Sequence, residues 1–261
     1  MNKVMVIKIG GATLGSHDTT IEDIVHLQKQ GRLLVVVHGG GKLITEWLGR
    51  HGVDTKFVRG ERVTDKATLE VATAVLAGLV NKEIAAEINN LGGRAVGISG
   101  VDGALIQSKV KNMELGYVGE MVKVDVGLLE ALLTAGYVPV ISPIGLHFFD
   151  RAEEAPQMLN INADLVAGDI AAAIGAERLI FLTDVAGISD QSGKLLSRLS
   201  SSEAEALVVS GVASGGMIPK IKACVRALAT TAATSIIDGR EPHALLREIE
   251  EKGGGTTIYR S

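Results

Sequence analysis

The sequence predicts an α/β protein, a three-layer αβα sandwich around a central, mainly parallel sheet. Aromatic residues make up only 3% of the 261-residue chain. The core must therefore be aliphatic, which suits parallel strands that are buried on both faces. Short aliphatic runs alternate with segments of helical periodicity, and the alternation returns in the second half of the chain. This pattern predicts one large domain, residues 1–261.

The first elements already show the alternation. Val4–Ile7 is a short apolar strand, and Thr20–Lys29 is an amphipathic helix. Leu33–Val37 is a second apolar strand, which leads through three glycines into a helix that ends near His51. Strand, helix, strand and helix in this order predict parallel strands with helices on both faces of the sheet.

The middle of the chain adds three features. A long helix is expected from Asp65 to about Asn90, with Thr64 as its N-cap. Residues 106–126 alternate and contain glycines, which predicts a β-hairpin that forms a lid or rim. Residues 146–158 are polar and irregular and mark the expected boundary between two lobes. The other expected elements are strands at Arg94–Ser99, Tyr137–Ile141, Arg178–Leu182, Ser235–Asp238 and Gly253–Ile258, and helices at Leu128–Ala135, Ser201–Ser210 and Pro242–Glu251.

Composition excludes several classes of function. The net charge of −4 provides no electrostatic footprint for nucleic acid, and no platform of interleaved aromatic residues is present. Cys224 is the only cysteine, so an intrachain disulfide and a thiolate metal cluster are excluded. No apolar run approaches the length of a membrane span, and the N-terminal stretch does not read as a signal peptide. We expect a cytoplasmic protein with no membrane or nucleic-acid partner.

Asp164 and two distant lysines form the main candidate site. Asn162 is a good N-cap, which places Asp164 in the first turn of a helix, where the helix dipole favours a carboxylate. Lys8 ends the first strand, and Lys220 follows Pro219 in the first turn of a later helix, where a cation opposes the dipole. The hypothesis is that both lysines grip a phosphoryl group and that Asp164 holds them. The alternative is that Asp164 is only a charged cap.

The glycines at 39–41 are a candidate anion site. They leave a strand and open a helix, so their bare N–H groups can approach an anion closely, although a tight turn alone would also need glycine. The loop is not a Walker A motif, because Leu43 follows Lys42. The segment from His38 onward also resembles the oxyanion motif of lipases. That class needs a G-x-S-x-G elbow, and Gly97–Val101 fails at its last position.

These motifs together, in this order, resemble the amino-acid kinase family over nearly the whole chain. Within it, they are similar to the members that phosphorylate N-acetyl-L-glutamate. The motifs that carry the resemblance are Lys8–Gly11, Val37–Gly41, Gly60–Asp65, Asn81–Lys82, Gly97–Gly100, Asn160–Asp164, Leu182–Val185, Gly215–Lys220 and Ile237–Ala244.

The resemblance implies ATP-dependent phosphorylation of the side-chain carboxylate of N-acetyl-L-glutamate to an acyl phosphate, the second step of arginine biosynthesis, with Mg²⁺ held largely through ATP. It implies that Lys8 and Lys220 stabilise the transferring phosphoryl group and that Asp164 organises both. It also implies further sites. These are Gly40, Gly41, Arg62 and Asn160 for the acid, Gly10 and Gly11 for phosphate, and Asp184, Val185, Ala186, Gly187, Ile188, Ser189, Val212, Ala213 and Ser214 for the nucleotide.

The resemblance also sets expectations for organisation. Residues 1–148 form an N-terminal lobe for the acid and the dimer contact, and residues 149–261 form a C-terminal lobe for the nucleotide. We expect a homodimer built on the Asp65–Asn90 helix, without strong inhibition by arginine. Lys42 and Val101 depart from the family pattern at positions that carry no assigned role.

The nucleophile of the implied reaction is a carboxylate. A carboxylate nucleophile is ionised at neutral pH and needs no general base, so His38 is interpreted as a packed structural residue. Two other functions stay open. One is a related kinase that acts on carrier-protein-linked aminoadipate in lysine biosynthesis. The other is a catalytically silent nucleotide sensor with the same fold.

Overall fold

An eight-stranded sheet in the order β12-β14-β13-β11-β1-β2-β8-β5 forms the centre of the molecule. The computed structural model describes residues 4–11, 19–58, 60–250 and 253–261. The strands pair in parallel except for β13 with β14, which are antiparallel. The prediction of a mainly parallel central sheet is confirmed. Its strands are β1 (Val4–Ile9), β2 (Leu33–His38), β5 (Ala95–Ser99), β8 (Val138–Ser142), β11 (Arg178–Thr183), β12 (Arg198–Ser200), β13 (Ala233–Asp238) and β14 (Gly255–Tyr259).

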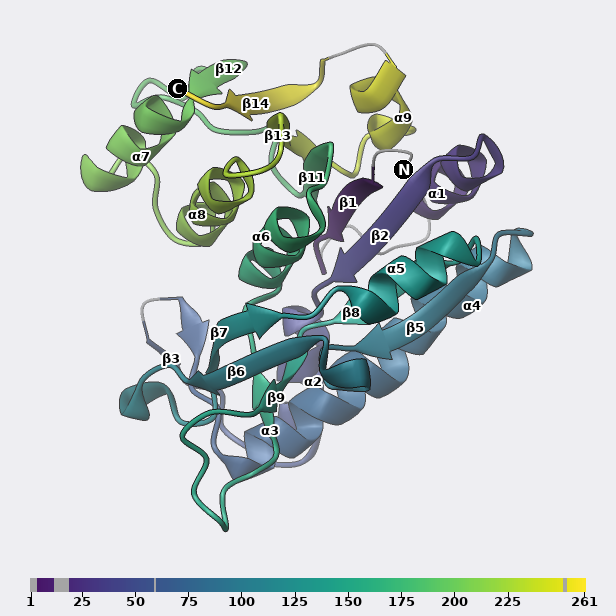
Figure 1. Ribbon diagram of the computed structural model, residues 1–261. Coiled ribbons are helices and arrows are strands. Elements are labelled where there is room, and N and C mark those ends of the chain that lie inside the picture. The colour runs from purple at the N-terminus through teal and green to yellow at the C-terminus, as the bar shows by residue number, and fades with distance from the viewer. Residues whose placement is uncertain (1–3, 12–18, 59, 251–252) are drawn as a thin grey trace.

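Helices cover both faces of this sheet (Figure 1). Alternate side chains of each strand point to opposite faces, as in Val4 and Val6 against Met5 and Ile7 of β1. One face packs against α5 (Gly127–Thr134), α6 (Ala163–Ile174), α7 (Ser201–Val209) and α8 (Met217–Ala227). The other packs against α1 (Thr20–Lys29), α2 (Gly41–Arg50), α3 (Lys66–Thr73), α4 (Asn81–Asn90) and α9 (Ala244–Glu250). The three-layer αβα sandwich is therefore confirmed.

The long helix predicted from Asp65 to Asn90 is present as one helical segment with a π-helical middle, Ala74–Val80. Its N-cap is Asp65 and not the predicted Thr64. The Asp65 carboxylate accepts a bond from Thr68 N at 2.8 Å. The Thr64 hydroxyl is turned elsewhere: it donates to Arg62 O at 3.0 Å and accepts a bond from Asn160 Nδ2 at 3.2 Å. The predicted end of the last helix at Glu251 lies outside the described residues.

A second, four-stranded sheet in the order β10-β9-β6-β7 packs beside the central one. It contains the predicted hairpin, as β6 (Ile106–Val110) and β7 (Gly119–Val124), which is joined through a 3₁₀ turn at Met113–Leu115. β9 (Ile144–His147), β10 (Met158–Asn160), the small hairpin β3 (Phe57–Val58) and β4 (Glu61–Arg62), and β12 were not predicted. These strands are too short to show a period. A second 3₁₀ turn spans Asp102–Ala104.

The two halves of the chain meet at the pairing of β1 with β11. Lys8 lies opposite Val37 of β2 and Phe181 of β11, so its side chain leaves the middle of the sheet close to the carboxyl ends of all three strands. Ligands of open α/β sheets bind at this edge. The boundary between lobes at residue 148 stays a prediction. Within the described ranges, no helix combines the length and the apolar character needed to cross a membrane.

Candidate active site

Asp164 lies between Lys8 and Lys220. Its Oδ1 is 2.7 Å from Lys8 Nζ, and its Oδ2 is 3.1 Å from Lys220 Nζ. Asn162 caps α6, because its Oδ1 accepts bonds from Asp164 N at 2.9 Å and Leu165 N at 3.2 Å. This cap sets where α6 begins and hence where Asp164 points. The structure thus joins three residues that the sequence places on β1, α6 and α8.

These three side chains carry one more positive than negative charge in a buried place. Lys8 and Asp164 side chains are 8% exposed and Lys220 is 16% exposed. Burial raises the pKa of the Asp164 carboxyl, but the ammonium groups of Lys8 and Lys220 together outweigh burial and leave the pKa below its ordinary value. Asp164 is therefore ionised at neutral pH and balances only one lysine. A buried excess cation is costly unless an anion binds beside it.

Backbone N–H groups surround the same place. Gly40 precedes α2 and supplies no side-chain cap, so among the described residues no side chain caps the N–H groups in the first turn of α2. Gly11 packs against them. A Cβ on Gly11 would lie 3.3 Å from Gly40 N and 3.6 Å from Gly41 N. The missing side chain of Gly11 therefore leaves room for an anion at these donors. Gly10 lies in the preceding turn, where its N donates to Leu182 O at 2.9 Å.

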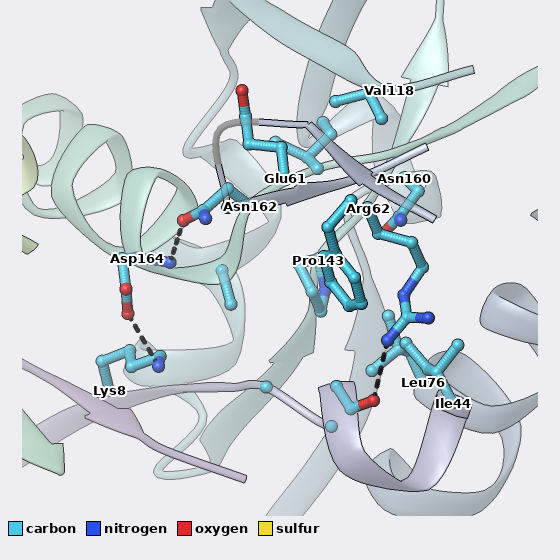
Figure 2. Close-up of a pocket in the computed structure, with 17 residues that line it drawn as sticks. Lys8, Ile44, Glu61, Arg62, Leu76, Val118, Pro143, Asn160, Asn162 and Asp164 are labelled. Carbon is cyan, nitrogen blue, oxygen red and sulfur yellow. Dashed lines mark hydrogen bonds and ion pairs between the residues drawn. The ribbon is translucent and has the colours of Figure 1, made fainter. Parts of the chain in front are cut away.

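A cavity of about 210 Å³ opens beside this cluster. Figure 2 shows Lys8 and Asp164 at one end of the cavity and Arg62 and Asn160 at the other. Apolar side chains from several elements form its walls. The residues that line it are Lys8, Gly39, Gly40, Gly41, Ile44, Phe57, Gly60, Glu61, Arg62, Leu76, Val118, Pro143, Asn160, Ile161, Asn162, Ala163 and Asp164. Lys220 is not among them, because it approaches Asp164 from α8.

Arg62 is buried at the far end of the cavity. Its Nη2 donates to Gly41 O and Thr45 Oγ1, both at 2.9 Å, so both protons of this nitrogen are used. The guanidinium also lies 4.8 Å from the centre of the Phe57 ring. A bidentate grip on a carboxylate, the predicted role, needs two parallel N–H groups. Arg62 can form that grip only when the ligand displaces one of these two bonds.

Asn160 lies at the end of β10 and also lines the cavity. Its Nδ2 donates to Thr64 Oγ1 at 3.2 Å, and its backbone N donates to Tyr117 O at 3.0 Å. The first bond holds the side chain, and the second holds the backbone of the strand end from which it projects. The structure thus brings Gly40, Gly41, Arg62 and Asn160 around one cavity.

The residues predicted to bind a nucleotide lie in two loops. Asp184–Ser189 follows β11, and Val212–Ser214 precedes α8. Asp184, Val185 and Ala186 are exposed, whereas Gly187, Ile188 and Ala213 are buried. Gly187 has φ +150°, and a Cβ there would lie 2.5 Å from Thr256 Oγ1. Both loops lie at the same edge of the sheet as Lys8, but none of these residues lines the cavity.

Sequence reasoning missed Thr45 and Phe57, and it gave no role to a third residue of this site, Asn81. Thr45 holds Arg62, Phe57 stacks on it, and Asn81 anchors His38. The spacing of Thr45 four residues after Gly41 on a helix is a signal that could have revealed it. Phe57 lies in a strand of two residues, which shows no period.

The chain is similar to known proteins along nearly its whole length. The model of the amino acid kinase family matches residues 3–238. An acetylglutamate kinase of Dehalococcoides mccartyi is 48% identical over 257 residues, which cover 98% of this chain and 94% of that protein. An acetylglutamate kinase of Thermosynechococcus vestitus is 49% identical over 261 residues, which cover 97% and 86%. Among solved structures, N-acetylglutamate synthase from Neisseria gonorrhoeae, complexed with coenzyme A and N-acetyl-glutamate, has a TM-score of 0.85 at 26% identity and covers 99% of this chain and 60% of that one.

Proposed function

The chain belongs to the amino acid kinase family, and we propose that it transfers the γ-phosphoryl group of ATP to the side-chain carboxylate of N-acetyl-L-glutamate, as a step of arginine biosynthesis. One observation carries the proposal. A buried group of two lysines and one carboxylate stands beside glycine N–H groups at one end of a cavity whose other end holds an arginine. Such a cavity suits an acid with two carboxylates, one at each end.

The reaction needs little covalent work from the protein. A carboxylate oxygen of the acid attacks the γ-phosphorus, the bond from that phosphorus to the bridging oxygen breaks, and ADP leaves with the electron pair. The attacking carboxylate is ionised at neutral pH, so no residue has to remove a proton. What remains is to hold the reactants in line and to stabilise the charge on the equatorial oxygens.

Lys8 and Lys220 would supply the positive charge that stabilises these oxygens. Asp164 holds Lys220 by a hydrogen bond and Lys8 by an ion pair, so both ammonium groups are placed before the substrates bind. The N–H groups of Gly40 and Gly41, with the room left by Gly11, would bind phosphoryl oxygens. At the other end, Arg62 would bind the α-carboxylate and Asn160 would contact the acid. A side chain of Glu length would place its carboxylate near Lys8.

The nucleotide would lie along the two loops at Asp184–Ser189 and Val212–Ser214. Mg²⁺ would arrive with it, bound to the phosphates. The donor set agrees with this, because the described residues contain no group of three acidic, His or Cys side chains able to hold a metal ion. Both oxygens of Asp164 face lysines, which makes this carboxylate a poor ligand. When bound, Mg²⁺ would neutralise charge on the β- and γ-phosphates.

We extend the proposal to a cytoplasmic homodimer. The Lys66–Asn90 helical segment is the proposed contact, but much of its apolar stripe already packs in the chain's own core. Leu69, Ala72, Leu76 and Val80 are 0–4% exposed, and Leu79 is half-buried. The contact must therefore use the outer side of this segment. Sedimentation at several concentrations would measure the oligomeric state, and a monomer at every concentration would contradict this part.

A hydroxylamine trap tests the reaction. The purified chain is incubated with MgATP, hydroxylamine and one acid at a time: N-acetylglutamate, glutamate, aspartate or N-acetyl-aminoadipate. Hydroxamate formed only from N-acetylglutamate is the expected result. Hydroxamate from none of these acids, in a folded protein that binds ATP, would contradict the proposal and favour a carrier-linked substrate or a silent sensor.

A further inference from the structure

His38 lies below the glycine loop in one defined protonation state. The residue is fully buried, its Nδ1 is 2.9 Å from Gly39 O, and its Nε2 is 3.2 Å from Asn81 Nδ2. A carbonyl oxygen only accepts, so Nδ1 carries the proton. An amide nitrogen only donates, so Nε2 carries none. Burial, partly opposed by the bond to Gly39 and reinforced by Lys8 and Lys82, lowers the pKa of His38 to about 4. The ring is neutral at the pH of the cell.

The bond to Gly39 determines the orientation of the next N–H group. The Gly39 carbonyl and the Gly40 N–H belong to one peptide group, and the described chain contains no cis peptide bond. In a trans peptide these two groups point in opposite directions. Because His38 draws the carbonyl into the interior, the Gly40 N–H is turned away from the ring. Gly40 lines the cavity, and within the described part of the chain no acceptor bonds to its N–H.

Asn81 anchors the ring from the far side. Its Nδ2 also lies 3.1 Å from Ile98 O of β5 and 2.9 Å from Val140 O of β8, so these two carbonyls and His38 Nε2 share its two protons. The side chain thus connects β5 and β8 to His38 at the end of β2. Gly97 makes room for it, because a Cβ there would lie 2.3 Å from Asn81 Oδ1. His38 therefore cannot turn without breaking a buried network.

The π-helical stretch before Asn81 closes the other side of the loop. A Cβ on Gly40 would lie 2.8 Å from Leu76 Cδ2 and 3.5 Å from Val80 Cγ2. Leu76 and Val80 lie within Ala74–Val80, and Asn81 follows directly. One helical segment therefore carries both the apolar support for Gly40 and the anchor for His38. π-Helical turns inside α-helices are frequent at functional sites.

We propose that His38 is a positioning residue for phosphoryl transfer: its Nδ1–H holds the Gly39 carbonyl and so aims the Gly40 N–H at the transferring phosphoryl group, while Asn81 fixes the ring. The inference rests on the proposed kinase function of this cavity. His38 touches neither substrate and exchanges no proton. Its contribution is to keep one donor oriented before the phosphoryl group arrives.

Two isosteric substitutions separate this role from simple packing. In H38N the side-chain amide nitrogen occupies the place of Nδ1 and can still donate to Gly39 O. In H38Q the amide reaches the place of Nε2, keeps a partner for Asn81 and leaves Gly39 O without its donor. We expect H38Q to lower kcat by about 10- to 100-fold with KM values within about threefold, and H38N to keep kcat within about threefold of the parent. Equal losses in both variants, or an unchanged kcat in H38Q, would overturn the proposal.

A spectroscopic measurement is independent of the acid substrate. In the ¹⁵N spectrum of the parent protein, Nδ1 of His38 should be protonated and Nε2 unprotonated between about pH 5.5 and 8, since the ring stays neutral there. Adding MgATP should shift the Gly40 amide resonance in the parent and in H38N but much less in H38Q. If no acid is phosphorylated but these shifts appear, the proposed function fails while the positioning role stands. If the Gly40 amide resonance of the parent does not shift when MgATP is added, the positioning role is contradicted.

Asn89 provides a matched control. It lies on the same helix as Asn81 and bonds to the backbone of Ala95, at the other end of β5, at 2.8 and 3.2 Å. Asn89→Ala should lower stability but leave kcat unchanged. Asn81→Ala should lower both. A kcat that falls equally in the two variants would show that any loosening of this helix harms catalysis, and that His38 has no specific role.

Discussion

Asp164 Oδ2 lies 3.1 Å from Lys220 Nζ, and the other oxygen of the same carboxylate lies 2.7 Å from Lys8 Nζ. One carboxylate therefore fixes two cations that come from opposite halves of the chain. The carboxylate offsets the repulsion between two ammonium groups that lie in one buried place.

Asp164→Asn keeps the shape of the side chain and removes its charge. Two buried ammonium groups are then left without a counter-charge, so the free energy of unfolding should fall by about 3 kcal/mol and kcat by about 100-fold. Urea unfolding and the hydroxamate assay measure the two effects. Asp169→Asn on the same helix is the control, because its partner Arg226 is 55% exposed and such pairs contribute about 0–1 kcal/mol. An Asp164→Asn protein as stable as the parent would contradict the account.

Lys220→Ala should lower kcat by about 100-fold and change both KM values by less than about threefold, since the ammonium acts mainly on charge that develops during transfer. Lys222, two residues further along α8 and exposed, is the matched control, and Lys222→Ala should behave as the parent. Steady-state kinetics with each substrate varied separates kcat from KM. A Lys220→Ala enzyme with a normal kcat would exclude a catalytic role for this lysine.

Arg62→Ala should raise the KM for the acid by about 100-fold with a smaller effect on kcat, because a lost carboxylate contact weakens binding before and during the reaction alike. Thr45→Val tests whether the ligand has to displace one of the two hydrogen bonds that Arg62 Nη2 donates. It removes one of the two acceptors of Nη2 without touching the cavity wall. Arg50→Ala, an exposed arginine of α2 that lies over Trp47, is the control. An unchanged KM in Arg62→Ala would place the α-carboxylate elsewhere.

Gly11→Ala should reduce kcat by about 10-fold or more, because its methyl group would occupy the room beside two donors that bind the phosphoryl group. The distances from that Cβ would be 3.3 Å to Gly40 N and 3.6 Å to Gly41 N. Gly49→Ala is the control. No atom lies within 4 Å of a Cβ there. This helical substitution should stabilise the chain by about 0.5–1 kcal/mol with no effect on kcat. Equal kcat values in the two variants would count against the phosphate site.

The pH dependence of stability should contain a term from His38. Its pKa of about 4 in the folded chain lies below the ordinary value of 6.5. The unfolded chain therefore binds more protons between these values, and stability must fall as the pH falls from about 6.5 to about 4. The loss amounts to about 3 kcal/mol. The unfolding free energy of H38N should decline less over this range. Buried carboxyls such as Asp23 are common to both proteins and cancel in the difference. If the unfolding free energies of the parent and H38N fell in parallel over this pH range, the pKa assigned to His38 would be contradicted.

The central sheet and the helices that cover it could be predicted because their signals are local. The aliphatic strands at Val4 and Leu33 and the cap at Asn162 can each be recognised within a few residues of sequence. The strands that were missed are two to four residues long, and β9 also depends on a partner, β6, that is distant in the sequence. The Thr64 cap was wrong because the hydroxyl oxygen accepts a bond from Asn160, a residue that is distant in the sequence.

The candidate site likewise has features that the sequence predicted and features that only the structure shows. The sequence by itself determined which residues carry charge and which glycines leave the backbone bare, and from these it predicted Lys8, Asp164 and Lys220 as one group. Only the tertiary structure decided that one nitrogen of Arg62 already donates to Gly41 and Thr45, and that Asn81 reaches across two strands to hold His38. The sequence specifies the type of each side chain, but a hydrogen bond also needs a direction. Between residues that are far apart in the sequence, packing alone sets that direction.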